Sequence, residues 1–340
     1  MIPYALPFRQ PYVTARGSLA RREIVLLRIR CEHGLTGLGE GVPMSLRGGD
    51  SLEAVVSDLE AWGQRTLNGS SDLSGLCPPA RIAAETALAD VEARRLEVPL
   101  YELLSPGCIP HSVQCNATLT AGEPAEVLRQ AEAWAAGGFT IFKLKLGAGD
   151  DLAQVEAVRS GLGDEVKIRI DPNEAWSAGE AEARLAALEP FGIELAEQPV
   201  AGMEAMSRLR KASPIPLVAD ESVTSSEQAA EAARLGACDA VTVKLSKTGS
   251  LDASLGGHLP TYLSSALDGP VGIAAAAHVA QTLPREGRWS RIAHGLATER
   301  LFASTIADHD DLLDGAMLPV PEGHGLGISI DERALKALRL

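Results

Sequence analysis

Strand-like and helical segments alternate along the chain from Ser112 onwards, and this alternation limits the fold more than any other feature of the sequence. The helical segments span residues 124–136, 151–162, 178–188 and 226–235. The strand-like segments span residues 113–118, 140–146, 166–171, 193–197, 217–220, 240–244, 261–266 and 291–296. Eight strands that alternate with helices predict an α/β protein with a parallel barrel of the (β/α)₈ kind, and an open doubly wound sheet is the alternative.

The first 111 residues follow a different pattern and predict a separate α+β domain. Residues 23–31 and 35–40 are strand-like and are separated by a short turn, which is typical of an antiparallel meander. From Ser51, a candidate N-cap, apolar residues recur at three- and four-residue intervals, and a second helical segment follows Pro79. We therefore expect strands followed by helices in this part of the chain.

The chain is acidic, with a formal net charge of −14 over 340 residues. Nucleic acids and anionic membranes repel such a surface, so neither is the expected partner. The five cysteines include no C-x-x-C pair, which is typical of a reducing compartment rather than of a disulfide framework. The first residues lack the pattern of a signal peptide, and no apolar run approaches the ~18 residues of a spanning helix. We therefore expect a cytoplasmic protein.

Charged residues end five successive strands of the predicted barrel. Lys143 and Lys145 share one face of their strand, because side chains alternate between the two faces. The following strands end in Asp171, Glu197, Asp220 and Lys244. Catalytic groups of parallel barrels lie at the carboxyl ends of the strands. These six side chains are therefore expected to converge at one rim.

The residue types at this rim indicate a chemistry. Asp171, Glu197 and Asp220 end adjacent strands, and three unpaired carboxylates so close together would repel one another. A hard divalent cation removes that repulsion, and oxygen ligands favour Mg²⁺ or Mn²⁺ over zinc. Lysines on both sides of such a metal suit the removal of a proton next to a carboxylate, with the metal stabilising an ene-diolate. Burial and a nearby cation are expected to lower the pKa of a lysine that acts as the base.

In this order, the motifs resemble the enolase superfamily, in its muconate-lactonizing-enzyme subgroup. They are Lys143-x-Lys145, Asp171-x-Asn173, Glu197-x-Pro199, Asp220-Glu221-Ser222 and Lys244. The resemblance covers nearly the whole chain and implies a modified TIM barrel, (β/α)₇β, with an N-terminal α+β capping domain. It divides the chain into a capping domain at residues 1–111, a catalytic barrel at 112–318 and a segment at 319–340 that returns to the cap.

The resemblance also implies roles for the residues at the rim. Asp171, Glu197 and Asp220 would be the ligands of Mg²⁺. Lys145 would contact the α-carbon of a small carboxylic acid substrate. Lys143 would help to neutralise the substrate carboxylate and would lower the pKa of its neighbour, and Lys244 would stand opposite. The chain is expected to be an enzyme that forms a homo-oligomer.

The residues of the predicted eighth strand narrow the choice among the reactions of this subgroup. The subgroup includes muconate cycloisomerases, dipeptide epimerases, N-acylamino-acid racemases and o-succinylbenzoate synthases, and dipeptide epimerases carry an Asp-x-Asp at this strand. Residues 293–298 contain no acid, and Asp308-x-Asp310 follows too late in the chain. Residues 294–302 and 262–267 resemble o-succinylbenzoate synthases. The expected enzyme is therefore a Mg²⁺-dependent carbon–oxygen lyase of menaquinone biosynthesis that eliminates water from a cyclohexadiene carboxylate. A racemase, epimerase or cycloisomerase is the alternative, and a non-catalytic metal-binding barrel is a third hypothesis.

Several residues are candidates for substrate binding. Arg169 precedes Asp171 by two positions and shares its face, and its alternative is a structural salt bridge. Asn173 shares that face too, and a turn-forming role is its alternative. The remaining candidates are Ser264 and Ser265 on the seventh strand and, in loops of the cap, Arg16 and Arg47.

Two further features of the sequence bear on the barrel. His294 lies on the eighth strand, where a catalytic histidine occurs in another subgroup of the superfamily, but it lacks the Asp on the preceding strand that goes with this role. Residues 248–257 leave room for two helical turns at most after the sixth strand. We therefore expect an irregular barrel wall at that point.

Overall fold

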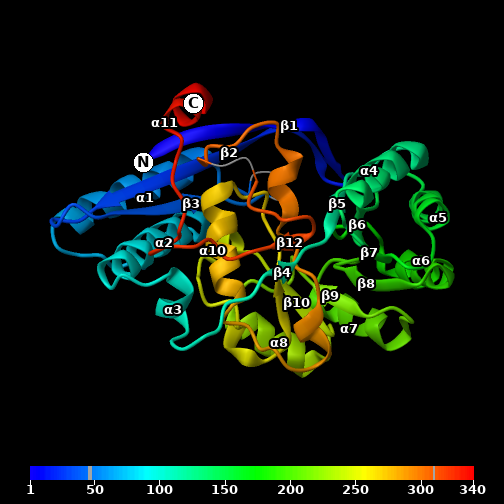
Figure 1. Cartoon of the computed structure of the whole chain (residues 1–340). Coiled ribbons are helices and arrows are strands. Elements are labelled where there is room, and N and C mark those ends of the chain that lie inside the picture. The colour runs from blue at the N-terminus through cyan, green and yellow to red at the C-terminus, as the bar shows by residue number, and fades with distance from the viewer. Residues whose placement is uncertain (45–47, 309–310) are drawn as a thin grey trace.

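The computed structural model describes residues 1–44, 48–308 and 311–340, which form a capping domain beside a barrel (Figure 1). The cap is built on a three-stranded antiparallel sheet in the order β1 (Ile2–Thr14), β2 (Gly17–Arg30) and β3 (Thr36–Gly41). Helices α1 (Leu52–Leu67) and α2 (Pro78–Arg95) pack on one face of this sheet. Ser51 caps α1, since its hydroxyl accepts a hydrogen bond from the Ala54 amide at 3.2 Å. The predicted strands and helices of the cap are thus confirmed.

Alternating glycines bring α2 against strand β3. A Cβ atom at Gly37 would come within 2.1 Å of the Ala87 carbonyl oxygen, and one at Gly39 within 1.8 Å of the Ala83 carbonyl oxygen. Any larger side chain at these positions would push the helix away from the sheet. These glycines therefore serve helix packing in the core of the cap.

The barrel is a seven-stranded parallel sheet in the order β11-β10-β9-β8-β7-β6-β5. Its strands are β5 (Ala117–Leu119), β6 (Ile141–Lys145), β7 (Lys167–Asp171), β8 (Ile193–Glu197), β9 (Leu217–Ala219), β10 (Ala240–Val243) and β11 (Thr261–Leu263). The helices that follow them are α4 (Pro124–Ala136), α5 (Asp151–Leu162), α6 (Ala178–Leu188), α7 (Met203–Ala212), α8 (Ser226–Leu235) and α10 (Pro270–Ala280). The parallel barrel predicted from the alternation is confirmed, and the doubly wound alternative is not observed.

The eighth strand is reduced to two residues. Parallel β-bridges of the backbone pair His294 with Cys115 and Gly295 with Ser264. These two bridges join the two edges of the seven-stranded sheet. The 3₁₀ helices η4 (Arg288–Arg291) and η5 (Ala297–Leu301) flank this segment. A Cβ atom at Gly295 would lie 2.5 Å from the Ser264 hydroxyl oxygen, so a larger residue here would force the Ser264 side chain to move where the barrel closes.

The wall after the sixth strand is irregular, as predicted. It contains only the short helix α9 (Leu245–Thr248) and the 3₁₀ turn η3 (Leu255–Gly257). Helix α2 of the cap packs against α9, and the Leu251 amide donates to the Glu85 carboxylate at 3.3 Å. The cap therefore covers the barrel wall at the point where the barrel's own helix, α9, is short.

The end of the chain returns to the cap. Helix α11 (Glu332–Leu338) lies beside β1 (Figure 1). Arg339 forms an antiparallel backbone β-bridge with Tyr4, and Arg28 forms an ion pair with Glu332 at 2.6 Å. The remaining elements are α3 (Leu100–Leu104), η2 (Glu189–Phe191) and the strands β4 (Val113–Gln114) and β12 (Met317–Leu318), which pair with each other. The numerical domain boundaries at 111 and 318 stay predictions.

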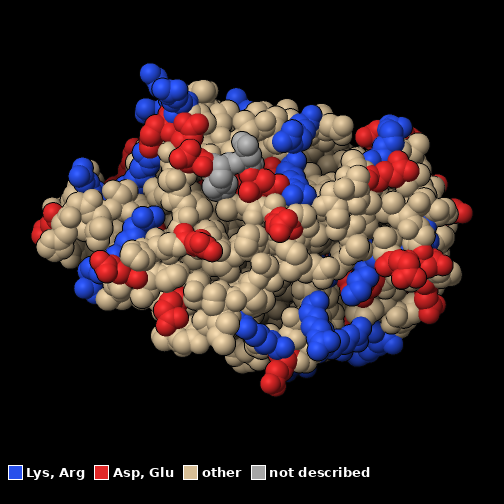
Figure 2. Space-filling model, in the orientation of Figure 1, with Lys and Arg blue, Asp and Glu red and all other residues tan. Residues whose placement is uncertain are grey.

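Acidic and basic side chains are interspersed on the face of the molecule shown in Figure 2. Within the described ranges, none of the helices combines the length and the apolar character needed to cross a membrane.

A buried carboxylate fastens the cap to the barrel. Glu40 of β3 is 3% exposed and accepts hydrogen bonds from the Gly269 amide at 2.5 Å, the Val271 amide at 3.2 Å and the Tyr4 hydroxyl at 3.1 Å. Two of these donors belong to the first turn of α10, where a helix exposes amides that lack partners inside the helix. Burial and the neighbouring Asp268 raise the pKa of Glu40 to about 8.

The raised pKa predicts how stability varies with pH. A carboxyl group whose pKa is higher in the folded state destabilises the fold as the pH rises towards that value. Burial also raises the pKa of Glu299 to about 8, whereas burial lowers the pKa values of His278 and His294 to about 4. Below pH 6.5 the two histidines make the free energy of unfolding rise with pH and so oppose the effect of the carboxyl groups. Above pH 6.5 the histidines no longer have this effect. The free energy of unfolding should therefore fall between pH 6.5 and pH 8.

Substitution of Glu40 tests this expectation. Glu40→Gln keeps an acceptor for the Gly269 amide but cannot titrate, so it should remove roughly 1 kcal/mol per pH unit from the slope. Urea denaturation at several pH values measures the slope. Glu23→Gln, which changes a partly exposed side chain on β2, is the matched control. An unchanged slope in Glu40→Gln would show that Glu40 does not titrate in this range.

Candidate active site

The three predicted carboxylates meet at one rim of the barrel. Asp171 ends β7, Glu197 ends β8 and Asp220 follows β9, and all three are fully buried. These strands are neighbours in the parallel sheet, so their carboxyl ends point the same way. The structure thus brings together the acids that the strand pattern singled out.

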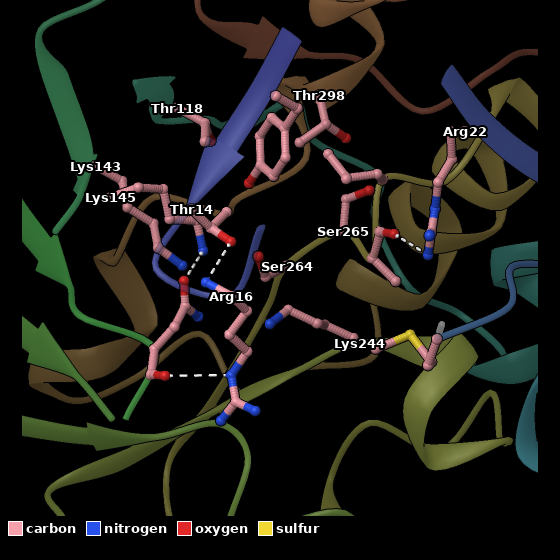
Figure 3. A pocket seen from close by; sticks show the side chains of 15 residues that line it. Thr14, Arg16, Arg22, Thr118, Lys143, Lys145, Lys244, Ser264, Ser265 and Thr298 are labelled. Atoms are coloured by element: carbon pink, nitrogen blue, oxygen red, sulfur yellow. Dashed lines mark hydrogen bonds between the residues drawn. The ribbon is translucent and has the colours of Figure 1, made fainter. Parts of the chain in front are cut away.

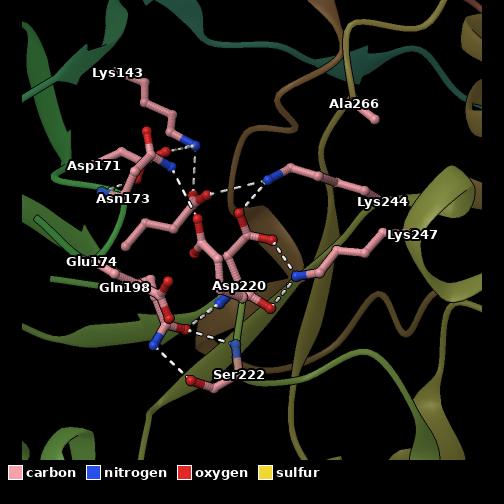
Figure 4. A network of polar contacts seen from close by, with 12 residues as sticks. Lys143, Asp171, Asn173, Glu174, Gln198, Asp220, Ser222, Lys244, Lys247 and Ala266 are labelled. Atoms are coloured by element: carbon pink, nitrogen blue, oxygen red, sulfur yellow. Dashed lines mark hydrogen bonds and ion pairs between the residues drawn. The ribbon is translucent and has the colours of Figure 1, made fainter. Parts of the chain in front are cut away.

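Lysines lie among these carboxylates, as Figure 4 shows for Lys143 and Lys244. The Nζ atom of Lys143 is 2.8 Å from Asp171 and 2.7 Å from Glu197. Lys145 lies 2.5 Å from Asp171, and Lys244 forms an ion pair with Asp220. The three lysines are at most 5% exposed. The contacts just described give each buried positive charge a buried negative partner, which offsets the cost of burying it.

A fourth lysine, Lys247, belongs to the same network, and the sequence analysis missed it. Its Nζ atom lies 2.8 Å from a carboxylate oxygen of Asp220 and also bonds the carbonyl oxygen of that residue (Figure 4). Lys247 follows Lys244 by three positions on the short helix α9. Residues three apart on a helix share a face, and this spacing could have revealed it.

Gln198 positions Asp220, and it too was not predicted. Its side-chain oxygen accepts hydrogen bonds from the amides of Asp220 at 3.0 Å and Ser222 at 3.2 Å. Its amide nitrogen donates to the Ser222 hydroxyl at 2.7 Å. A buried glutamine directly after β8 therefore fixes the backbone after β9.

The charges of the network shift its pKa values in opposite directions. Burial would raise the pKa of Asp171, but Lys143 and Lys145 outweigh burial and hold this pKa well below its usual range. Burial raises the pKa of Glu197. Burial would lower the pKa of Lys143, yet Asp171 and Glu197 raise it well above its ordinary value. The pKa of Lys143 is raised because two carboxylates contact its ammonium group.

The donor set at the rim suits a hard cation. One carboxylate oxygen of Glu197, Oε1, is buried and accepts no hydrogen bond from the described residues, and the Lys244 Nζ atom lies 3.9 Å from it. A buried oxygen in this state is costly and favours a ligand that supplies positive charge. In the part of the chain that the structure describes, no three acidic, histidine or cysteine side chains are already arranged around a common point, since lysine ammonium groups lie between the carboxylates.

A cavity opens above this network between the barrel and the cap (Figure 3). Lys143 and Lys145 reach it from one side and Lys244 from the opposite side. Its described lining contains five cationic side chains and no carboxylate, and it comprises Tyr12, Thr14, Arg16, Arg22, Met44, Thr118, Lys143, Lys145, Asn173, Lys244, Ser264, Ser265, Ala266, Leu267 and Thr298. Asn173, Ser264 and Ser265 thus line this cavity, and Asn173 also accepts a hydrogen bond from Lys145 at 3.1 Å.

The turn between β1 and β2 leans over the cavity. Arg16 at this turn pairs with Glu174 and donates to the carbonyl oxygen of Asn173 at 3.3 Å. Its side chain is about one third exposed. Arg16 therefore ties the cap to the loop that follows β7. Arg47, the other candidate in the cap, lies outside the described residues.

Arg169 lies away from the cavity lining. Its guanidinium donates to Glu194 at 2.6 Å, to the Ala293 carbonyl oxygen at 2.6 Å and to Asn116 at 3.2 Å. These contacts join strand β7 to its neighbour β8 and to the segment that closes the barrel. They favour the structural role that the sequence left as the alternative.

His294 is also outside the described lining of the cavity. Its Nδ1 atom accepts a hydrogen bond from the Leu263 amide at 3.0 Å. Burial lowers its pKa to about 4. Its contacts serve barrel closure.

Two family models together match most of the chain. The model described as the N-terminal domain of mandelate racemase / muconate lactonizing enzyme matches residues 2–105. The model described as enolase C-terminal domain-like matches residues 126–334. The superfamily and subgroup expected from the motifs are confirmed.

Similar proteins carry the names of isomerases. Muconate cycloisomerase 1-2 of Acinetobacter lwoffii is 30% identical over 363 residues, covering 98% of this chain and 92% of that protein. The structure of N-succinyl Arg/Lys racemase from Bacillus cereus ATCC 14579 has a TM-score of 0.90 at 25% identity, covering 100% of this chain and 96% of that one. The dipeptide epimerase from Enterococcus faecalis V583, complexed with Mg and dipeptide L-Leu-L-Tyr, has a TM-score of 0.87 at 26% identity, covering 96% and 97%. These names support the isomerase alternative better than the expected lyase.

The contacts of Arg169 generate a prediction. Arg169→Met would remove the buried one of the two cations that pair with Glu194 and would leave two buried acceptors, the Ala293 carbonyl oxygen and the Asn116 side-chain oxygen, without this donor. This loss should lower the free energy of unfolding by roughly 3 kcal/mol. Lys167→Met is the matched control, because Lys167 also pairs with Glu194 but is more than half exposed, and it should cost less than about 1 kcal/mol. Urea denaturation measures both. A weakened substrate affinity with unchanged stability would instead support substrate binding by Arg169.

Proposed function

Because the chain belongs to the enolase superfamily, in its muconate-lactonizing subgroup, we propose that it is a Mg²⁺-dependent isomerase acting on a small carboxylic acid. The enzyme would remove a proton from the carbon next to the substrate carboxylate and return a proton to the product. The similar proteins bear names of cycloisomerases, epimerases and a racemase, which supports this class of reaction.

The placement of two lysines carries the proposal. Lys145 comes from β6, whereas Lys244 follows β10 on the other side of the cavity (Figure 3). Inversion at a carbon atom needs one base to take a proton from one face and an acid to deliver a proton to the other. A substrate between these lysines would offer one face to each, so either lysine could act as base while the other acts as acid.

The carboxylates are proposed as the metal ligands. Asp171, Glu197 and Asp220 would hold Mg²⁺, and similar dipeptide epimerases were solved with Mg. When bound, Mg²⁺ would supply positive charge to the substrate carboxylate and to the negative charge that grows there as the proton leaves. Lys247 and Gln198 would keep Asp220 in place through the contacts described above.

The remaining groups would orient the substrate. Lys143 would place a second positive charge at the substrate carboxylate. Asn173, Ser264 and Ser265 line the cavity and offer polar atoms. The cap would exclude water through the turn held by Arg16 and Glu174.

Elimination of water, as in an o-succinylbenzoate synthase, needs one base only. Lys145 could remove the proton and pass it to the departing hydroxide on the same face, and Lys244 would then stay charged. The similar proteins do not favour this chemistry over isomerisation. The non-catalytic hypothesis gives no role to two lysines buried on opposite sides of a cavity.

The first test of this proposal concerns the metal. Glu197→Gln keeps the shape of the side chain but removes its charge, so it should weaken Mg²⁺ binding roughly 100-fold or more. Isothermal titration calorimetry with MgCl₂ measures the affinity without any substrate. Glu204→Gln on the exposed side of α7 is the control and should bind as the wild type does. Equal affinities in the two variants would exclude Glu197 as a ligand.

The second test separates two bases from one. In D₂O, Lys145→Met and Lys244→Met should each lose racemisation of N-acylamino acids by a factor of about 10²–10⁴. Each variant should still exchange the α-proton of the one enantiomer that faces its remaining lysine, as NMR can show. If Lys244→Met retained full racemisation while Lys145→Met lost it, a one-base mechanism would replace the two-base mechanism proposed here. Lys211→Met, an exposed change on α7, is the control.

A further inference from the structure

Two lysines of one short segment contact the two oxygens of the same carboxylate. Lys244, directly after β10, forms an ion pair with Oδ2 of Asp220. Lys247 lies three positions later on α9, and its Nζ atom is 2.8 Å from Oδ1 of Asp220 (Figure 4). It also donates to the carbonyl oxygen of Asp220. Each oxygen of this carboxylate therefore has its own ammonium partner.

The two lysines lie in different surroundings. Lys244 lines the cavity between the barrel and the cap, whereas the described lining of that cavity does not include Lys247. Lys247 instead borders a separate hollow between Pro79 of the cap and Glu221 of the barrel, and its side chain is 12% exposed. A substrate in the cavity would thus meet Lys244 but not Lys247. Lys247 can therefore act on the reaction only through the groups that it contacts.

The ammonium group of Lys244 occupies a place that also suits a metal ion. Its Nζ atom contacts Oδ2 of Asp220 and lies 3.9 Å from Oε1 of Glu197, the buried oxygen that accepts no hydrogen bond from the described residues. Both oxygens belong to proposed metal ligands. Like charges in a poorly solvated site repel strongly, so a divalent cation held by these oxygens would compete with the ammonium group. We therefore expect Lys244 to leave Oδ2 when such a cation binds.

Lys247 does not compete in this way, because it contacts the other oxygen of the carboxylate. Its bonds to Oδ1 and to the carbonyl oxygen fix both the side chain and the backbone of Asp220. A carboxylate held at one oxygen and at its own backbone loses the freedom to rotate. Lys247 can therefore keep its bonds when a cation replaces Lys244 at Oδ2.

The short helix α9 that carries Lys247 is anchored at two further points. The Ser246 hydroxyl donates to the Asp268 carboxylate at 2.9 Å. A Cβ atom at Gly249, which has a φ of +69°, would lie 2.9 Å from the Cα atom of Pro78, so the end of α9 packs closely on the cap. These contacts give Lys247 a fixed base from which to hold Asp220.

We propose that Lys247 is a positioning residue of the metal site, which orients Asp220 so that Oδ2 binds the cation and Lys244 is released to the cavity. The proposal rests on the proposed function for the identity of the metal ligands, but it concerns metal affinity and needs no turnover. The two lysines then act in opposite directions on the cation. Lys244 opposes its binding, and Lys247 supports it.

The sign of the change in Mg²⁺ affinity separates positioning from simple electrostatics. Lys244→Met and Lys247→Met each remove one positive charge from the same carboxylate. Charge alone predicts that both variants bind Mg²⁺ more tightly than the wild type. Positioning predicts the opposite for Lys247→Met, because the partners that orient a metal ligand typically contribute roughly 10- to 100-fold to metal affinity.

Isothermal titration calorimetry with MgCl₂ and no substrate measures these affinities. Lys244→Met should bind Mg²⁺ roughly tenfold more tightly than the wild type, because the competing ammonium group is gone. Lys247→Met should bind it roughly 10- to 100-fold more weakly. Lys247→Arg keeps the charge and the donors, so it should bind Mg²⁺ more tightly than Lys247→Met.

Two controls match the change in charge and the disturbance of the helix. Lys211→Met removes one exposed positive charge on α7. Ser246→Ala removes the bond that α9 makes to Asp268 but leaves the contacts of Lys247 in place. Each control should change the Mg²⁺ affinity less than about twofold, since exposed charges are screened and sites without shared partners act independently.

Three results would overturn the proposal. The first is an affinity of Lys247→Met that equals or exceeds that of the wild type. The second is an equal loss of affinity in Ser246→Ala, which would assign the effect to helix α9 as a whole. The third is weaker binding by Lys244→Met, which would exclude competition at Oδ2. If circular dichroism shows that Lys247→Met does not fold, Lys247→Gln, which also lacks the charge, is judged by the same sign.

This proposal and the proposed function can fail separately. Absence of Mg²⁺ binding by the wild type would refute both. Binding that is weakened by Glu197→Gln but not by Lys247→Met would refute only the role of Lys247. The expected affinities without racemisation or α-proton exchange of any N-acylamino acid would refute the isomerase that we propose, but would leave the role of Lys247 standing.

Discussion

Mutual neutralisation of buried charges is the constraint on which the barrel mouth depends. Three carboxylates without solvent exposure would each cost several kcal/mol if unpaired, and the buried lysines offset this cost through direct contact. The pairing depends on strand register, since Lys145 lies opposite Asp171 in the β6–β7 ladder. A slip of one residue would turn the lysines of β6 towards the surrounding helices. The same charges that suit proton transfer thus also specify how the strands align.

The cap and the barrel contribute different parts of the site. The barrel supplies the carboxylates and lysines, while the first two strands of the cap and the turn between them supply Tyr12, Arg22 and Arg16. Contacts across the seam keep the two parts in register: Glu40 binds the first turn of α10, and Arg22 binds Ala266. The cavity therefore keeps its lining from both parts only while this seam holds.

Much of this arrangement could be predicted from local patterns in the sequence. Helices α4, α5, α6 and α8 begin and end where their apolar spacing predicted, and the ends of β7 and β8 carry the expected acids. The contacts of Gln198 and Arg22 could not be predicted, because they join residues far apart in the chain whose meeting depends on the packed fold. The eighth strand was expected to be a full strand, but only His294 and Gly295 pair, since the chain turns into 3₁₀ helices on both sides.

The return of the chain to its starting strand has a consequence for synthesis. The Leu340 amide donates to the Pro3 carbonyl oxygen at 3.1 Å, and Arg339 bridges Tyr4, the residue whose hydroxyl also bonds Glu40 (Figure 1). The outer edge of β1 therefore cannot be completed until the ribosome has released residues 339 and 340.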